Sequence, residues 1–174
     1  PVGEIIGIIG NNGAGKSTFA RCLCGLDKKA SGTLEMNDTV YDRKKRLHTS
    51  YMVMQDVNHQ LFTEDVLDEL LLSMDGEDEA MDTARAHEIL SSLDLLDKVK
   101  LHPMALSGGE KQRVAIGSAI ASNKEIMVFD EPTSGLDYRH MLEVAKNLNA
   151  LKNMGKSLFL ITQDPELIYK CCTY

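Results

Sequence analysis

A glycine-rich segment near the start of the chain has the residue types and spacing that bind phosphate. It follows an apolar, strand-like run and consists of Gly10, Asn11, Asn12, Gly13, Ala14, Gly15, Lys16, Ser17 and Thr18. Its glycines let main-chain N–H groups approach an anion closely. We expect Lys16 to reach the β- and γ-phosphates and the Ser17 hydroxyl to ligate Mg²⁺. This P-loop, residues 10–18, therefore predicts bound ATP or GTP at a helix start.

A glycine-rich turn between a strand and a helix could instead bind nothing. That alternative leaves Lys16 unexplained, because the positive end of the helix dipole opposes a cation in the first helical turn. Nucleotide binding accounts for the lysine and is the interpretation favoured here.

A second pair of chemically capable residues follows the apolar run 126–129, which ends in Asp130 and Glu131. A carboxylate at the end of a strand can hold Mg²⁺ through water, and the next can orient or deprotonate an attacking water. We therefore expect Asp130 to serve the metal and Glu131 the reaction. Acidic residues often end a strand in a loop without any function. The presence of a P-loop in the same chain favours the catalytic interpretation.

A second helix start, at Ser107, Gly108, Gly109 and Glu110, could also bind an anion. A serine followed three residues later by a glutamate is a capping box, which any helix could use. That explanation leaves the two glycines unaccounted for, since each costs about 1 kcal/mol relative to alanine in a helix. Bare N–H groups here would contact phosphate. The local positive potential would be raised by two nearby cations, Lys111 and Arg113.

The composition is that of a globular protein of one domain. The chain has 174 residues, 43% hydrophobic and 26% charged, which is enough for one α/β core. No stretch approaches the roughly 18 apolar residues of a membrane span, and no signal peptide opens the chain, so a soluble protein is expected. Four cysteines lack the spacing of a zinc site and are expected to be reduced thiols: Cys22, Cys24, Cys171 and Cys172.

The formal net charge of −7 argues against nucleic acid as a partner, because affinity for a phosphate backbone comes from Lys and Arg. One basic run, residues 43–46, is the local exception. Without interleaved aromatic residues, it is interpreted as a solvated loop or hairpin edge rather than as a binding patch.

The elements that must position these residues follow from hydrophobic periodicity. Short apolar runs predict buried parallel strands at 4–9, 125–129 and 157–161. Helices are predicted at 16–25, 64–74, 79–93, 107–122 and 138–153. A hairpin is expected over 32–41, around an Asn37-Asp38 turn. The fold class is therefore α/β, a mainly parallel sheet of P-loop type flanked by helices, with a small antiparallel flap and an inserted helical subdomain over 64–103.

Together these segments resemble the ATP-binding cassette (ABC) family over nearly the whole chain. Residues 106–110 are similar to its signature motif, Asp130 and Glu131 to its Walker B aspartate and catalytic glutamate, and residues 134–137 to its D-loop. Gln55 matches the glutamine of its Q-loop, which contacts Mg²⁺ and links to a membrane subunit. The resemblance places further residues in the nucleotide-binding set, namely Ser107, Gly108, Gly109 and Asp137.

A finer resemblance links residues 55–66 to the energy-coupling-factor ATPases of vitamin and metal importers. Those proteins follow the Q-loop with a Gln-Leu-Phe segment and a helix that docks a membrane partner. One apolar helix face is predicted from Val66, Leu67, Leu70, Leu71 and Met74. Leu61, Phe62 and Leu72 fall outside that face and could form a groove for a partner's helix. Each could equally belong to the core of the helical subdomain.

The chain departs from the family in two ways. Family members usually end the last catalytic strand with a histidine that touches the γ-phosphate, whereas this chain has Gln163. An amide can donate a hydrogen bond but cannot titrate, so we expect Gln163 to give slowed or pH-insensitive hydrolysis. The chain also begins shortly before the P-loop and ends at Tyr174, as in a trimmed cassette or a divergent member. The aromatic residue that stacks on adenine in the family is therefore not seen. The choice of ATP over GTP is inferred from the family resemblance alone.

The family mechanism pairs two cassettes head to tail, so that the P-loop of one faces the signature helix of the other across ATP. ATP binding closes the pair and hydrolysis releases it. The expected function is an ATP-binding and ATP-hydrolysing importer subunit with Mg²⁺, paired with a second ABC subunit and a transmembrane subunit. It would lie in the cytoplasm, at the inner face of the cell membrane.

Two other functions remain open. A soluble cassette of DNA repair or translation would clamp nucleic acid, but the interval between Lys16 and Ser107 is too short for the long insert of the DNA-repair branch. A regulatory nucleotide-binding module with little turnover is favoured by Gln163 and the short ends. The transported substrate cannot be read from this chain, because membrane subunits choose it in this family.

Overall fold

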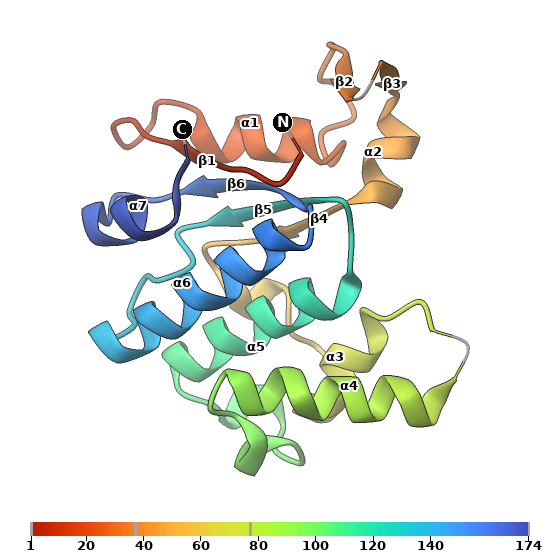
Figure 1. The fold of residues 1–174 in the computed structure, drawn as a ribbon, viewed down its shortest axis with the longest axis vertical. Helices are drawn as coiled ribbons and strands as arrows, with labels where there is room; N and C mark the ends of the chain where they lie inside the picture. The colour runs from red at the N-terminus through yellow and green to blue at the C-terminus, as the bar shows by residue number, and fades with distance from the viewer. Residues whose placement is uncertain (1, 37, 77, 174) are drawn as a thin grey trace.

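A four-stranded parallel sheet forms the centre of the computed structural model, which describes residues 2–36, 38–76 and 78–173 (Figure 1). The strands lie in the order β1-β6-β5-β4, and each neighbouring pair is parallel. Their bounds are β1 (Ile5–Ile8), β4 (Ser50–Val53), β5 (Ile126–Asp130) and β6 (Ser157–Ile161). Because all four run the same way, their carboxyl ends meet at one edge. The predicted α/β fold is confirmed.

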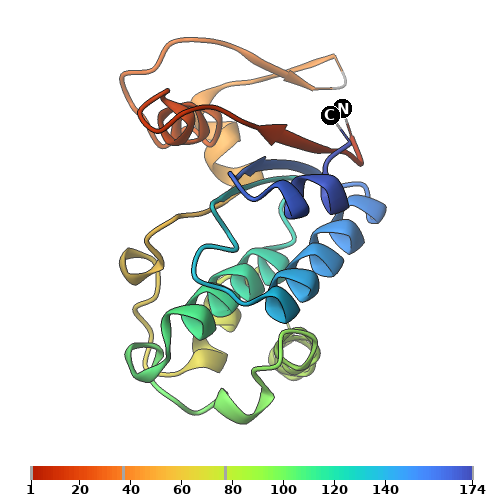
Figure 2. The same cartoon turned by 90° about the vertical axis from the view of Figure 1, so that its left-hand side faces the viewer.

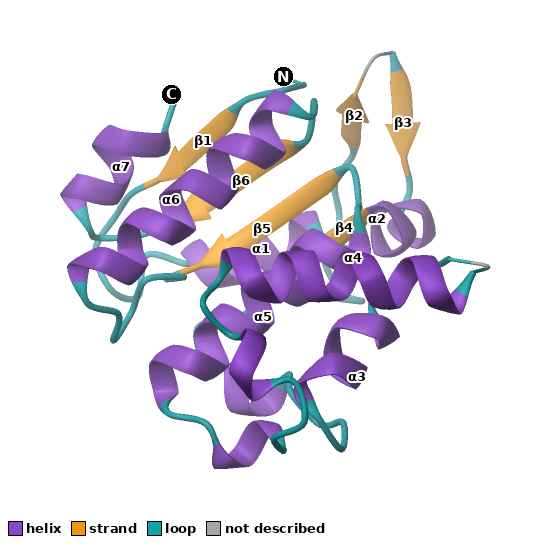
Figure 3. Ribbon diagram, turned by 60° about the horizontal axis from the view of Figure 1, so that its bottom comes forward, coloured by secondary structure: helices purple, strands orange, loops and turns teal. Residues whose placement is uncertain are grey.

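Helices cover both faces of this sheet (Figures 2 and 3). On β5, Val128 packs in one cluster with Ala20 and Leu23 of the first helix. Its neighbours Met127 and Phe129 belong to a larger cluster on the opposite face. Successive side chains of a strand point to opposite faces, so a strand buried on both sides is apolar without interruption.

The helices are α1 (Lys16–Leu23), α2 (Arg43–Thr49), α3 (Val66–Leu72), α4 (Glu79–Ser92), α5 (Gly108–Ser122), α6 (Tyr138–Asn153) and α7 (Pro165–Cys171). Short 3₁₀ helices are η1 (Val57–His59), η2 (Leu96–Lys98) and η3 (Pro103–Ala105). The predicted helix at 64–74 is shorter than expected because the Asp65 side chain accepts a hydrogen bond from the Asp68 N–H and so begins α3 at Val66. In the described part of the chain, none of the helices has the length and apolar character needed to cross a bilayer.

The predicted hairpin is present as β2 (Leu34–Met36) and β3 (Thr39–Tyr41), paired antiparallel. Asn37 of its expected turn lies outside the described residues. The interpretation of the basic run 43–46 as a loop or hairpin edge is wrong, because these residues form most of α2. Asp42 caps that helix by accepting from the Lys45 N–H. Arg46 is buried and donates to the Cys22 carbonyl. Its charge had indicated an exposed position, whereas the side chain packs against the end of α1.

Two further elements were not predicted. Strand β4 is short and mixed in character, and it is defined by pairing with β5. Helix α7 ends beside β1, where the Thr173 N–H donates to the Ile5 carbonyl at 2.8 Å, so the two ends of the chain lie together (Figure 2). The four cysteines are free, as expected. Burial raises the pKa of the Cys24 and Cys171 thiols to about 11, which disfavours the reactive thiolate.

Candidate functional site

The P-loop connects the end of β1 to the first turn of α1. Gly13 and Gly15 adopt left-handed backbone conformations, with φ of 83° and 89°, which a side chain would disfavour. Gly15 is the N-cap of α1, and no side chain caps the helix there. The main-chain N–H groups of the first turn are thus presented without a competing side-chain acceptor.

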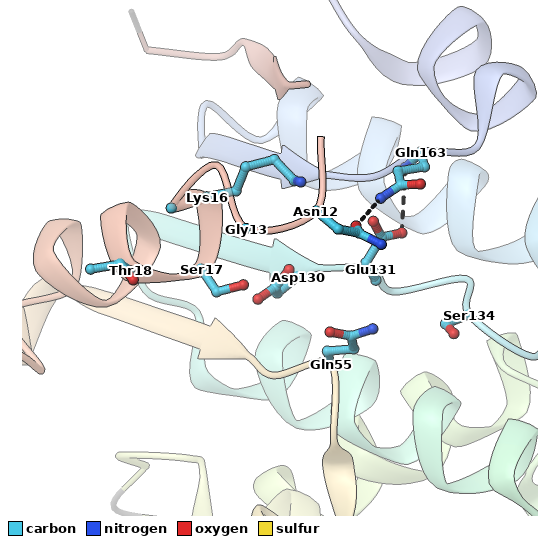
Figure 4. A pocket seen from close by; sticks show the side chains of 11 residues that line it. Asn12, Gly13, Lys16, Ser17, Thr18, Gln55, Asp130, Glu131, Ser134 and Gln163 are labelled. Carbon is cyan, nitrogen blue, oxygen red and sulfur yellow. Dashed lines mark hydrogen bonds between the residues drawn. The ribbon is translucent and has the colours of Figure 1, made fainter. Parts of the chain in front are cut away.

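Lys16 curls back over this loop. Its Nζ donates to the carbonyls of Gly10 at 2.8 Å and Asn11 at 3.0 Å. The Ala14 N–H also donates to the Asn11 carbonyl, at 3.1 Å. These contacts hold the ammonium close to the turn of the loop, where it faces the same cavity as the helix start (Figure 4).

A cavity of about 590 Å³, called the P-loop cavity below, lies at the edge of the sheet where the strands end. It receives residues from the ends of all four parallel strands (Figure 4). Its lining consists of Asn12, Gly13, Gly15, Lys16, Ser17, Thr18, Gln55, Asp130, Glu131, Ser134 and Gln163. Of the predicted P-loop residues, Gly10, Asn11 and Ala14 shape the loop without lining the cavity. Ser134 was not predicted to face it.

Three oxygen-bearing side chains converge in this cavity on the side of α1. The Ser17 hydroxyl and the Asp130 carboxylate point into the same space, and Gln55 lies across from them (Figure 4). Asp130 is 4% exposed. Among the described residues no group of three or more His, Cys, Asp and Glu could hold a metal ion. One carboxylate with neutral oxygens fits Mg²⁺, which shares its coordination sphere with phosphate and water.

Glu131 stands in an unusual backbone conformation. Its φ is 50°, in the left-handed region that side chains other than glycine rarely adopt. Its N–H donates to the Ile161 carbonyl of β6 at 2.8 Å, which holds the chain in this conformation. Strained conformations of this kind persist where the surroundings impose them and cluster at functional sites.

Gln163, just after β6, connects the P-loop to Glu131. Its side-chain amide donates to Asn12 Oδ1 at 2.6 Å, and its main-chain N–H lies 3.4 Å from Glu131 Oε2. The residue at the position of the family's usual histidine therefore lines the P-loop cavity, with its amide held by the loop (Figure 4).

The signature residues line a different cavity, of about 670 Å³, called the signature cavity below. Ser107, Gly108, Gly109 and Asp137 lie there and are absent from the lining of the P-loop cavity. Gln55 and Ser134 border both. The predicted capping box is present: the Glu110 N–H donates to Ser107 Oγ, and the Ser107 N–H donates to Glu110 Oε2. This second hydrogen bond lowers the pKa of the Glu110 carboxyl.

Comparison with known proteins identifies the family. A family model described as ABC transporter matches residues 1–134. The chain belongs to the ABC transporter family. A Treponema denticola protein assigned as an ABC transporter ATP-binding protein is 45% identical over 172 residues, 98% of this chain and 34% of the relative. The methionine import ATP-binding protein MetN of Bacillus subtilis is 36% identical over 181 residues, 98% of this chain and 52% of the relative.

Solved structures agree with this assignment. The structure of cbiO1 from Clostridium perfringens, described as part of the ABC transporter complex cbiONQ, superimposes with a TM-score of 0.78 and 26% identity. The superposition covers 98% of this chain and 71% of that one. The chain spans between about a third and half the length of these curated relatives.

The two glycines of the signature motif, Gly108 and Gly109, have different surroundings. A Cβ added at Gly109 would lie 3.2 Å from Leu136 Cδ2 of the D-loop, whereas one added at Gly108 would meet nothing within 4 Å. A methyl group at Gly109 would therefore press on Leu136 of the same chain, a packing constraint that sequence reasoning missed. Gly108 is the glycine whose surroundings leave room for a ligand.

These surroundings predict different effects for two otherwise identical substitutions. Gly108→Ala is expected to raise the free energy of unfolding by up to about 1 kcal/mol, because alanine favours the helix. Gly109→Ala should gain less or lose stability, because Leu136 must move. Denaturant unfolding of both variants measures the difference, and equal changes would contradict it.

The two cations of α5, the signature helix, form hydrogen bonds with other segments. Lys111 Nζ donates to Asn58 Oδ1 of η1 at 3.1 Å. Arg113 is buried, and its Nε donates to the Leu93 carbonyl at 2.9 Å. Arg113 Nη1 lies 4.0 Å from where a Cβ of residue 109 would be. Arg113 thus adds positive charge beside Gly109, as predicted, while Lys111 ties the helix to η1.

The segment after the Q-loop is only partly the exposed surface that was expected. Of the two alternatives for Leu61, the structure supports the core, because this side chain is buried in the main hydrophobic cluster. Phe62 and Leu72 are 74% and 60% exposed. The buried Glu69 holds Phe62 in place, since its Oε2 accepts from the Phe62 N–H at 3.0 Å. All five residues of the predicted helix face pack in or against the core: Val66, Leu67, Leu70, Leu71 and Met74.

Proposed function

We propose that this chain is an ATP-binding and ATP-hydrolysing subunit of a membrane transporter, which couples nucleotide-driven pairing to import. The P-loop cavity carries the proposal. In one space it gathers a helix start with bare N–H groups, an ammonium, and two acids at the end of β5. These groups follow the ends of β1 and β5, and this edge of a parallel sheet is where such folds bind nucleotides.

Each residue has a distinct proposed role. Lys16 and the P-loop N–H groups would hold the phosphates. Ser17, Gln55 and Asp130 would hold Mg²⁺, which when bound neutralises charge on the transferring phosphoryl group. Glu131 would position and deprotonate the attacking water. Gln163 would donate a hydrogen bond into the cavity that it lines.

We further propose that a second ABC subunit completes the site. Ser107, Gly108, Gly109 and Asp137 line the signature cavity and not the P-loop cavity of the same chain. The separation supports head-to-tail pairing, in which each signature helix faces the phosphates bound by the other subunit. Gly108 is exposed, and a Cβ added there would meet nothing within 4 Å, which leaves room for a contact across the pair.

The importer assignment is proposed from relatives and from one exposed side chain. MetN is named as a methionine import protein and cbiO1 as part of a transporter complex. Phe62, exposed beside the Q-loop, suits a transmembrane partner subunit. The chain would then lie in the cytoplasm at the inner face of the membrane. We propose residues 1–174 as one nucleotide-binding domain, with 64–103 as its helical subdomain.

The proposal is tested by equilibrium dialysis with labelled ATP and by phosphate release, each with and without Mg²⁺. Magnesium-dependent uptake followed by release of phosphate is the expected result. Absence of uptake by the folded chain would refute the proposal. Uptake without release would instead favour a regulatory module.

Replacing Gln163 with histidine tests the proposed role of this position. Because Gln163 lies between the P-loop and Glu131, a histidine there would face the phosphates. Hydrolysis by Gln163→His is expected to be several-fold faster, and its rate should vary with pH between about 5 and 8, where histidine titrates. Phosphate release measured across that range decides it. A variant no faster than the parent would count against the role.

A further inference from the structure

The D-loop, residues 134–137, is followed directly by α6, whose first turn carries His140. Asp137 is the N-cap of α6, and its Oδ1 accepts from the His140 N–H at 2.9 Å. The ring contributes a second contact, because His140 Nδ1 lies 2.9 Å from the same oxygen. One histidine therefore binds the last D-loop residue through both its main chain and its side chain.

The opposite edge of the same ring faces the helical insertion. His140 Nε2 lies 3.9 Å from Asp94 Oδ2, just beyond the end of α4. Arg139 also pairs with this carboxylate. The His140 side chain is 19% exposed, while those of Asp137 and Asp94 are 65% and 60% exposed. The imidazole is thus lodged between two outward-facing carboxylates from separate segments.

The surroundings are a charged cavity of about 480 Å³ between the segment that follows α4, which includes η2, and the helices α5 and α6. The charged groups that face His140 there, besides Asp137, are Asp94, Asp97, Lys98, Glu110, Arg113 and Arg139. Several of them already form pairs: Lys98 lies 3.8 Å from Glu110, and Arg139 Nε lies 3.7 Å from Glu143. The His140 ring contacts the D-loop through Nδ1 and approaches the helical insertion through Nε2.

A second contact fixes the D-loop from its other side. Leu136 packs against the position where a Cβ of Gly109 would lie, so the residue before Asp137 rests on the signature helix. From these contacts we propose that His140 is a positioning residue, which holds the Asp137 carboxylate in one orientation on the surface that meets a second subunit. The consequence for pairing rests on the proposed function.

The ring contact is tested directly by carboxyl ¹³C NMR titration of Asp137. In the parent, hydrogen bonds from the main chain and ring of His140 hold the pKa of Asp137 below its usual range. His140→Leu keeps the main-chain bond and removes the ring bond, so the pKa should rise. His140→Asn places an amide donor near the position of Nδ1 and should restore it. An Asp137 pKa that is the same in the leucine variant and the parent would overturn the proposal.

The consequence for pairing is tested in a Glu131→Gln background, by sedimentation velocity with MgATP. His140→Leu is expected to weaken MgATP-induced pairing about tenfold, a shift of about 1.4 kcal/mol. The ATP affinity of the unpaired chain, measured by dialysis at protein concentrations too low for pairing, should be unchanged. The His140→Asn variant should pair with an affinity within threefold of that of the parent. Equal pairing by the leucine variant would overturn this role for His140. Failure of the parent to bind MgATP would refute the proposed function instead, while the NMR titration would still decide the ring contact.

Discussion

Replacing Glu131 with glutamine is expected to lower the rate of ATP hydrolysis by about 10²- to 10⁴-fold while MgATP binding persists. The amide keeps the size of the side chain but cannot accept the proton of an attacking water. The left-handed backbone at this position, with φ of 50°, should be tolerated as before, because glutamine and glutamate share the same Cβ. Single-turnover phosphate release measures the effect.

Glu166→Gln is the matched control for this prediction. Glu166 lies exposed at the start of α7, outside the lining of the P-loop cavity, and the substitution also removes one carboxylate. Its rate should stay near that of the parent. If Glu131→Gln released phosphate at the parental rate, Glu131 could not be the general base.

Replacing Lys16 with alanine is expected to weaken MgATP binding by about 10- to 100-fold. A hydrogen bond to a charged group contributes about 1.5–3 kcal/mol, and Lys16 is the ammonium beside the bare N–H groups of α1. The same change removes the hydrogen bonds from Nζ to the carbonyls of Gly10 and Asn11. Part of the loss would therefore come from a less ordered loop.

Lys28→Ala serves as the control for lost charge, because Lys28 is exposed in the loop after α1 and outside the cavity. Equilibrium dialysis should show parental affinity for this variant and greatly reduced uptake for Lys16→Ala. Circular dichroism checks that both remain folded. Parental affinity in Lys16→Ala would contradict the proposed phosphate contact.

The parts of the site that sequence predicted are those set by short-range rules. The P-loop joins a strand to the helix that follows at once, so spacing alone places Lys16 and Ser17. Asp130 and Glu131 sit at the end of a strand recognisable from its unbroken apolar run. The capping box of Ser107 and Glu110 is likewise a contact within one turn.

The parts that sequence missed depend on segments far apart along the chain. The steric constraint at Gly109 comes from Leu136, and nothing near position 109 signals it. Strand β4 exists through its pairing with β5 rather than through its own pattern. Arg46 is buried against the end of α1, although a run of four cations predicts a solvated surface. Tertiary packing overrides local pattern in each case.

The neighbouring positions of β1 and β6 affect when the protein can first act. Strand β1 carries the P-loop and pairs only with β6 among the described strands, with Ile5 opposite Leu158. Strand β6 follows β1 and its loop only after all the other strands of the sheet, so the phosphate-binding loop is synthesised well before the strand that supports it. Nascent chains that end before residue 157 should fail to retain ATP, so nucleotide capture would mark the point in synthesis at which β6 has paired with β1.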